Sequence, residues 1–234
     1  MLGTYVNTIV IIIGSFLGLL LKNGLKDKYK KTIMQGVALA ILFIGISTSL
    51  DGIFNGGEPI LFIISLVFGG ILGEFIDVDT KLINLGEWIQ NKLGSNENNI
   101  SRGFVTATLL FCVGTMAILG SLESGLRGNH DMLYAKSVLD GISSVILAST
   151  LGIGVTLSAI SVLIYQGCIT LLASFVEPIL TTEVIREVSI IGGILIFSLG
   201  LNLLEVVKIK TANLLPAIII PPIYYLIKHF IEKI

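Results

Sequence analysis

The chain has 234 residues, of which 53% are hydrophobic and only 13% are charged, and its formal net charge at pH 7 is −1. With a mean hydropathy of +0.93, this composition excludes an ordinary soluble domain and indicates an integral membrane protein. The near-neutral charge argues against a nucleic-acid partner. Long unbroken apolar runs exclude the alternating strands of an outer-membrane barrel, so we expect an all-α, polytopic transmembrane helix bundle.

About eight segments are long and apolar enough to cross a bilayer, since a membrane-spanning helix needs roughly 20 apolar residues. The first has no basic start and no small-residue cleavage site, and lysines follow it, so we expect a retained helix and not a signal peptide. In chain order the predicted segments are 2–21, 33–50, 59–74, 103–122, 137–151, 154–175, 188–204 and 213–227.

Basic residues in the short loops indicate how the bundle is oriented. Five lysines follow the first segment with one acid among them, whereas the next loop has Asp51 and Glu58 and no base. Because cytoplasmic loops carry an excess of lysine and arginine, we expect the N-terminus to face outward.

Residues 77–94 differ in character from the segments on either side. Apolar residues recur there at helical spacing with charged residues between them, and the only tryptophan, Trp88, lies among them. This pattern predicts an amphipathic helix on the inner membrane surface. Membrane anchoring is the favoured role, and binding of a partner is the alternative.

The uncharged stretch 141–176 is too long for one span, because a single helix of that length would measure about 54 Å. Glycine costs roughly 1 kcal/mol relative to alanine inside a helix. We therefore expect the chain to unwind at mid-bilayer after Leu151, at Gly152 and Gly154. The fifth segment is then either a short span or a re-entrant half-helix, and a re-entrant segment would reduce the number of spans to seven.

A shift of 155 residues superposes the first three segments on the last three and matches Gly45 with Gly200. Each matching helix then comes five spans later and is inverted, as in many secondary transporters. The predicted single transmembrane domain, 1–234, divides into a three-helix unit (1–75), the interfacial helix (77–94), a central broken-helix pair (103–153) and a second three-helix unit (154–234). Chance similarity between apolar stretches is the alternative, and a re-entrant fifth segment would make the repeats parallel.

Polar side chains of the central pair are the candidates for a solute path. An acid beside an uncharged run is costly unless it is paired or faces a wet cavity, and Lys136, one turn before Asp140, is the predicted partner. The alternative for Asp140 is a position in the headgroup region. The alternative for the glycines is close helix packing, and for the hydroxyls it is hydrogen bonding within their own helix. The predicted path residues are Asp140, Ser143, Ser149, Thr150, Gly152, Gly154, the facing Thr115, Gln166 and Asn7.

Small residues also form faces for close helix packing, either within the bundle or in a homo-oligomer. No catalytic motif is present, and the two histidines are isolated. We therefore expect no enzyme activity, no cofactor and no metal site. The small-residue faces are Ser65, Gly69 and Gly73 on the third segment and Gly192, Gly193 and Gly200 on the seventh.

Several stretches carry a likeness to a known family: GTYVN from Gly3, CVGTMAILGSL from Cys112, KSVLDG from Lys136, ASTLGIGVTLSAI from Ala148 and YQGCIT from Tyr165. They resemble a bacterial inner-membrane family catalogued as domain of unknown function 554, and the likeness covers nearly the whole chain. The resemblance implies a multi-pass protein of the bacterial cytoplasmic membrane, often labelled a transporter, and it implies no substrate.

The favoured hypothesis is a small transporter or channel for ions or small polar solutes, with a path lined by broken helices near mid-membrane. Its partners would be the lipid bilayer and the solute. The alternative is a membrane scaffold without transport activity, which would bind a lipid or a partner protein through the 77–94 helix and the small-residue faces.

Overall fold

The computed structural model describes residues 1–22, 27–84, 100–112 and 114–231, and every regular element within these ranges is helical. Residues 78–84 are helical, whereas the remainder of the predicted 77–94 helix, with Trp88, lies outside the described residues. The helices are α1 (Leu2–Lys22), α2 (Asp27–Phe54), α3 (Pro59–Ile76), α5 (Ile100–Cys112), α6 (Thr115–Leu126), α7 (Asp131–Leu151), α8 (Gly154–Leu171), α9 (Ala173–Val176), α10 (Thr182–Leu203), the 3₁₀ helix η1 (Thr211–Ile219) and α11 (Ile220–Ile231).

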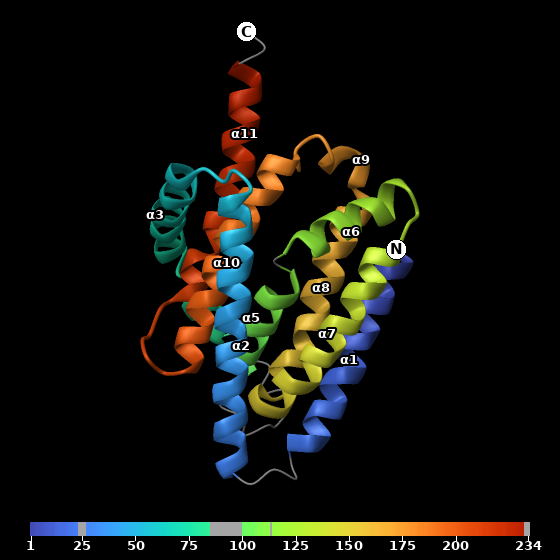
Figure 1. The fold of residues 1–234 in the computed structure, drawn as a ribbon, viewed down its shortest axis with the longest axis vertical. Coiled ribbons are helices and arrows are strands. Elements are labelled where there is room, and N and C mark those ends of the chain that lie inside the picture. The colour runs from blue at the N-terminus through green and yellow to red at the C-terminus, as the bar shows by residue number, and fades with distance from the viewer. Residues whose placement is uncertain (23–26, 85–99, 113, 232–234) are drawn as a thin grey trace.

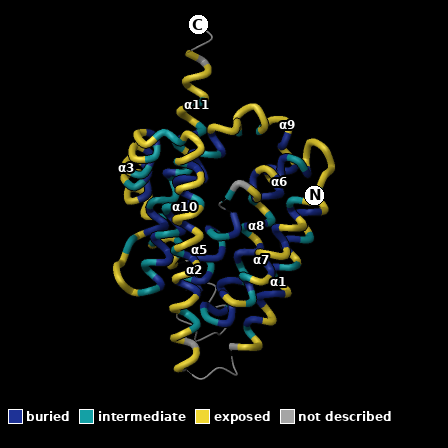
Figure 2. Tube along the Cα trace, viewed as in Figure 1, coloured by how far each residue is buried: buried dark blue, intermediate teal, exposed yellow. Residues whose placement is uncertain are grey.

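Seven helices among the described residues are long and apolar enough to cross a membrane, and the bent pair of α5 and α6 would be an eighth. Large apolar side chains such as Phe43, Phe54 and Phe75 are more than two-thirds exposed. Figure 2 shows such exposed positions on the outer faces of the bundle and buried ones between the helices. The predicted all-α membrane bundle is confirmed, and its outer surface is suited to lipid contact.

The helices pack in two groups (Figure 1). In the first group α7 and α8 both pack along α1, and α8 also packs against α5 and α6. In the second group α2 packs along α10, and α3 packs against η1. The groups meet where α10 contacts α5 and α6 and where α2 contacts α7. In the most apolar 18 residues of α10, 78% are buried, a larger share than in α2 or α3, so α10 is the innermost helix of the second group.

Small residues hold the second group together at short range. A Cβ atom at Gly45 would lie 2.5 Å from the main-chain nitrogen of Phe197, and one at Gly73 would lie 1.8 Å from the main-chain oxygen of Asn213. Close approach of this kind drives helix association where the surrounding lipid is as apolar as the side chains. The small-residue faces predicted on the third and seventh segments therefore pack against η1 and α2 within the chain.

Gly152 ends α7 and Gly154 begins α8, but this break does not lie at mid-bilayer. α7 has 21 residues, as α1 has, and runs beside it, with Gly3 against Leu133 and Gly18 against Ala148. The turn at Gly152, where φ is 79°, therefore lies level with the end of α1 (Figure 1). The predicted mid-bilayer unwinding after Leu151 is wrong, because the fifth helix begins six residues earlier than predicted.

Within the central pair, the interrupted segment is instead the fourth, in which no break was placed from the sequence. α5 and α6 are bent by 59° relative to each other. Gly114, at the start of α6, has φ 149°, a conformation that favours glycine. Since α5 has 13 residues, or about 20 Å of helix, the bend lies within the thickness of a roughly 30 Å hydrocarbon layer.

The bundle has two ends, which we call the amino end, where α1 begins, and the lysine end, where α1 ends and α2 begins. α7 and α10 begin at the amino end, and α5 begins toward the lysine end (Figure 1). α11 extends beyond the amino end, so the two chain termini lie at the same end of the bundle (Figure 1).

Candidate functional site

A charged and polar network lies inside the first group, where α1, α7 and α8 meet. Lys136 Nζ donates to both carboxylate oxygens of Asp140, at 2.8 and 2.7 Å. Asn7 Nδ2 donates to Asp140 Oδ2 at 3.0 Å and to Gln166 Oε1 at 3.3 Å. These four residues, hereafter the central network, connect three helices through side chains alone.

All four side chains are deeply buried. Asn7 and Gln166 are 0% exposed, Asp140 is 5% exposed and Lys136 is 7% exposed. Asp140 is the tenth residue of α7, which places it about 14 Å from the start of the helix, near the middle of the hydrocarbon layer. The side chain of Asp140 thus lies between helices and halfway along α7, which favours a position inside the membrane over the headgroup region, and the predicted pairing with Lys136 is confirmed.

Burying this pair is costly for the fold. Each ion loses several kcal/mol of hydration, and a buried pair rarely stabilises a protein more than well-packed apolar side chains of similar volume. Removing one partner alone costs about 3–5 kcal/mol, because the other charge is left uncompensated. Ionisable residues inside membrane segments are typical of solute and ion pathways, so the network is the first candidate for a functional site.

Two polar atoms of the network have no hydrogen-bond partner among the described residues. They are Asn7 Oδ1, an acceptor, and Gln166 Nε2, a donor. A buried polar atom without a partner costs about 1–3 kcal/mol, and such atoms call for a specific explanation. The pair offers one acceptor and one donor to a small molecule that reaches this depth.

A further polar contact lies along α1 and α8 toward the amino end. The hydroxyl oxygens of Thr4 and Thr170 are 3.5 Å apart, and both residues are buried. Because Thr4 precedes Asn7 by about one turn of α1, polar side chains continue from the network toward the amino end along this interface.

The interrupted fourth segment ends beside the network. Cys112 is the last residue of α5 and is buried, and it lies within electrostatic range of Lys136 and Asp140. A helix interruption at membrane depth is tolerated where the freed main-chain groups are buried in protein or face a water-filled cavity. The bend between α5 and α6 therefore begins close to the Lys136–Asp140 pair.

The structure brings together three of the nine predicted path residues, Asn7, Asp140 and Gln166. Two others use their hydroxyl groups within α7: Ser149 donates to the main-chain oxygen of Ile146 at 2.8 Å, and Thr150 donates to that of Leu147 at 2.9 Å. Hydrogen bonds of this kind satisfy a hydroxyl inside an apolar helix, so these two residues have a structural explanation.

Of the remaining four predicted residues, three lie outside the network. Ser143 is half-buried on α7, and Gly152 forms the turn after it. Gly154 allows α8 to approach α5, because a Cβ atom there would lie 2.1 Å from the main-chain oxygen of Ile100. The side chain of Thr115 lies outside the described part of the structure.

A second buried acid was missed by the sequence analysis. Glu187 on α10 is 0% exposed, accepts a hydrogen bond from the main-chain nitrogen of Glu58 at 2.8 Å and lies 3.7 Å from Arg186 Nε. Tyr225 on α11 donates to Glu58 at 3.2 Å. The adjacent Arg186 and Glu187 just before an apolar run were the available signal, and the cluster ties α3, α10 and α11 together at the amino end.

A polar cluster also joins the end of α3 to the start of η1. Asn213 donates to Glu74 at 2.6 Å and accepts from the main-chain nitrogen of Asp79 at 2.7 Å. Lys210 pairs with Glu74, and its hydrogen bond to that carboxylate raises the pKa of Lys210 above the ordinary lysine value. Glu74 and Lys210 are exposed and Asn213 is buried, and together they fasten the end of α3 to the start of η1.

Comparison with known proteins identifies relatives along almost the full length. The family described as "Protein of unknown function (DUF554)" matches residues 2–226. "Uncharacterized membrane protein YdfK" of Bacillus subtilis (strain 168) is 41% identical over 229 residues, which cover 98% of this chain and 97% of that protein. "Uncharacterized protein YqgA" of Escherichia coli (strain K12) is 27% identical over 225 residues, or 94% of each chain. No solved structure matches.

Proposed function

The chain belongs to this membrane family of unknown function, and we propose that it is a small transporter or channel that carries ions or small polar solutes across the bacterial cytoplasmic membrane. The observation that carries the proposal is the central network, an ion pair buried near mid-depth with an amide oxygen and an amide nitrogen left without partners. A bundle with only a structural role gains little stability from such a network, whereas a solute path requires polar groups at this depth.

The proposed path enters from the amino end. A solute passing the Thr4–Thr170 contact reaches Asn7 Oδ1 and Gln166 Nε2, which replace the hydrogen bonds that the solute made with water. Lys136 and Asp140 neutralise each other, so the site suits a neutral polar solute. A small ion could also bind there, a cation beside Asp140 or an anion beside Lys136, while the pair stays in contact. α6 lies against α7 and α8, and movement about the bend before it is the proposed way to open the path.

We also propose that the first three and last three membrane segments are inverted copies of one unit. Under this repeat α1 corresponds to α8, and the two central segments, α5–α6 and α7, correspond to each other. The contact between α1 and α7 should therefore have a counterpart between α8 and α5–α6, and both contacts are present. The crossing of α2 and α10 follows the same exchange: Gly45 lies against Phe197, and Gly200 lies against Leu42. Two inverted units can expose one site alternately to the two sides of the membrane.

The orientation in this proposal has the amino end outside the cell. The five lysines from the end of α1 to the first turns of α2 then lie on the cytoplasmic side, as the positive-inside rule requires. The exposed Lys228 near the end of α11 would lie outside, and the larger group of lysines at the opposite end outweighs it.

The scaffold alternative has less support. The small-residue faces on which it depends are occupied within the chain by η1 and α2. Its other element, the 77–94 helix, lies mostly outside the described residues. Transport is therefore the function that the geometry supports best.

The test is flux through purified protein reconstituted in liposomes. Proton, sodium and potassium uptake would be followed with enclosed dyes, and glycerol and urea uptake by light scattering. We expect flux above that of protein-free liposomes for at least one of these probes, and at least a tenfold reduction in the Asp140→Asn variant, because that substitution removes the charge that Lys136 and Asn7 contact.

Asp131→Asn is the matched control, because it makes the same chemical change at an exposed position on the same helix. It should leave flux unchanged. Flux in Asp140→Asn equal to that of the wild type would exclude the central network as the path, and absence of flux for every probe would reject transport of these solutes.

A further inference from the structure

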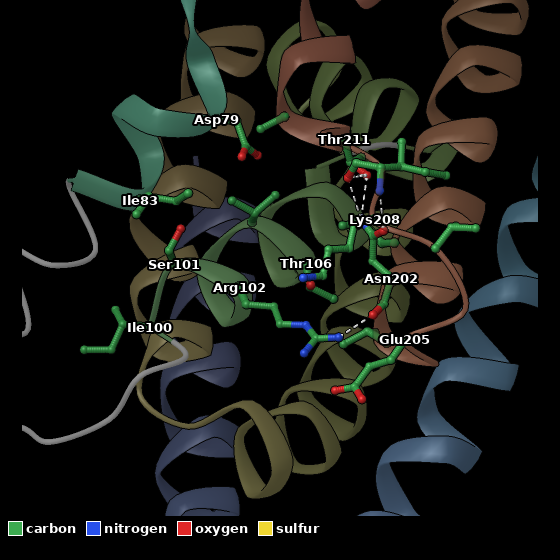
Figure 3. Close-up of a pocket in the computed structure, with 16 residues that line it drawn as sticks. Asp79, Ile83, Ile100, Ser101, Arg102, Thr106, Asn202, Glu205, Lys208 and Thr211 are labelled. Carbon is green, nitrogen blue, oxygen red and sulfur yellow. Dashed lines mark hydrogen bonds between the residues drawn. The ribbon is translucent and has the colours of Figure 1, made fainter.

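A second polar site lies in a cavity of about 1180 Å³ between α5, the end of α10, the segment 204–210 and the start of η1. Figure 3 shows the polar side chains that line it, among them Arg102, Thr106 and Asn202. Arg102 and Cys112 are ten residues apart on α5, or about 15 Å. The cavity is therefore a site distinct from the central network, and it lies toward the lysine end.

Arg102 is the main cation of the cavity. One of its N–H groups donates to the main-chain oxygen of Asn202, at the end of α10 (Figure 3). A guanidinium has five N–H donors in a planar fork, and the described residues provide no other hydrogen bond to it. The contact with α10 orients the guanidinium and leaves further donors for a ligand.

Thr106 supplies an independent observation. It lies one turn after Arg102 on α5, is 1% exposed and lines the same cavity, yet its Oγ1 has no hydrogen-bond partner among the described residues. A hydroxyl in an apolar helix commonly donates to the main-chain oxygen four residues earlier. The hydroxyls of Ser65, Ser121 and Ser137 do so. Other buried hydroxyls also have no partner among the described residues, but of all these only Thr106 lines this cavity. The hydroxyl of Thr106 therefore has its donor available for a ligand in this cavity.

Asn202 shapes the cavity and has no free amide group to offer a ligand. Its side chain donates to the main-chain oxygen of Ile209 at 2.7 Å and accepts from the main-chain nitrogen of the same residue at 2.8 Å. These two bonds hold the segment 204–210 in a closed loop at the cavity wall. The wall opposite Arg102 is therefore formed before any ligand binds, which lowers the entropic cost of binding.

The charges on the cavity wall limit the ligand further. Lys208 adds a second cation, and the first turn of α5 adds the positive end of a helix dipole. Asp79 and Glu205 also line the cavity, and they disfavour a ligand with several negative charges. The lining therefore suits one oxyanion group on a small molecule.

We propose that this cavity binds a small oxyanion through Arg102 and Thr106. The guanidinium accepts two oxygens of a carboxylate or phosphate side by side, and the Thr106 hydroxyl donates to one of them. The oxyanion belongs either to a free solute or to the phosphate of an anionic lipid headgroup. A headgroup could reach the cavity because the cavity lies toward one end of the bundle.

The experiment measures binding and does not depend on flux. Thermal unfolding of the protein in dodecyl maltoside would be followed with increasing sodium acetate, succinate or phosphate, at an ionic strength held constant with sodium chloride. At least one of these anions should raise the melting temperature in a saturable manner. A second arm would compare nanodiscs of phosphatidylcholine alone with nanodiscs that also contain phosphatidylglycerol.

Two variants test the assignment. Arg102→Gln should weaken binding at least about tenfold, since a hydrogen bond to a charged group is lost. Thr106→Val should weaken it about three- to tenfold and leave the melting temperature without anion unchanged, because the hydroxyl it removes has no hydrogen-bond partner in the part of the chain that the structure describes. Thr106→Val remains informative if Arg102→Gln does not fold. Arg127→Gln is the control, because Arg127 has a side chain that is 77% exposed in a loop at the amino end.

Each outcome is decisive. A saturable shift with a soluble anion that both variants weaken supports an oxyanion site for a free solute. A shift that only phosphatidylglycerol produces, and that both variants weaken, supports the same site and assigns it to a lipid headgroup. No shift in either arm, or equal shifts in the wild type and both variants, would overturn the proposal.

Discussion

The buried pair of Lys136 and Asp140 leads to the sharpest prediction, because stability and transport should respond differently to its removal. The perturbations are Lys136→Met, Asp140→Leu and the double variant, each of which replaces a charge with an apolar side chain of similar size. Asn7 also donates to Gln166, so we expect that contact to remain in all three variants and the rest of the network to change little.

The magnitude follows from the geometry. At 2.7 Å, the attraction between the two charges is about 6 kcal/mol with an effective dielectric constant of about 20, and the lost hydration of the two ions offsets most of it. Each single variant leaves one uncompensated charge and should lose about 3–5 kcal/mol. For a chain of this length that corresponds to a fall in melting temperature of about 6–20 °C.

The double variant should behave differently. With both charges removed, neither desolvation nor attraction remains, and replacement of a buried pair by apolar residues is often neutral or stabilising. We expect its melting temperature to return to within about 4 °C of the wild type, which is about 1 kcal/mol. The proposed function also predicts that flux stays absent in the double variant, although the fold is recovered.

The assay is thermal unfolding in dodecyl maltoside, paired with the liposome flux measurement. The exposed pair of Glu123 and Arg127, 3.9 Å apart, provides the control cycle, because such pairs contribute well under 1 kcal/mol. If the losses of the two single variants simply add in the double variant, the reasoning about a compensated ion pair is refuted. If the double variant is stable and transports normally, the pair has only a structural role.

Three further predictions concern packing, strain and pH. Gly73→Ala should destabilise the protein by more than 1 kcal/mol, because the new Cβ atom would lie 1.8 Å from a main-chain oxygen of η1; Gly36→Ala, with nothing within 4 Å, should be neutral or stabilising by up to about 1 kcal/mol. Unfolding in detergent measures both. Gly114→Ala meets no neighbouring atom, so any loss should come from its φ of 149° alone, at about 1–3 kcal/mol; a melting temperature equal to that of the wild type would show that the bend does not need glycine. Glu74 raises the pKa of Lys210. The contribution of this pair to the free energy of unfolding is therefore fully present below the ordinary lysine pKa and is lost as the pH rises through the raised value. The difference in melting temperature between the wild type and Lys210→Met should be small and should disappear at strongly alkaline pH.

The sequence predicted the helix ends around Gly152 and Gly154 but misplaced the depth of that break. The error came from Lys136, whose charge led us to begin the fifth membrane segment after it. Asp140 neutralises that charge one turn later, and Asn7, 133 residues away along the chain, completes the hydrogen bonding. The pairing with Asp140 was predicted from the sequence, so the start of α7 was misplaced because Lys136 was still taken as the end of the apolar segment. Only the contact with Asn7 could not be recognised from the local sequence, because Asn7 lies on another helix.

The oxyanion cavity was hidden for a similar reason. Arg102 was placed just outside the predicted fourth segment, which was expected to begin at Gly103. Its contact with Asn202 joins residues 100 positions apart, and the unpaired hydroxyl of Thr106 can be recognised only when its surroundings are known. In contrast, Gly45 and Gly200 already matched under the repeat and lie at the crossing of α2 and α10, because close packing of small residues leaves a clear sequence pattern.

The two central membrane segments each depart from a regular apolar helix, and they do so at similar depth. Asp140 lies about 14 Å from the amino end along α7, and α5 ends about 20 Å from the lysine end, which leaves about 10 Å of a 30 Å layer above the bend. Cys112, the last residue of α5, lies within electrostatic range of the Lys136–Asp140 pair. Main-chain groups freed at a bend are less costly beside charged side chains than beside lipid, and the charges are less costly beside free main-chain dipoles. Each departure therefore lowers the cost of the other, which is a reason for both to occur in one place.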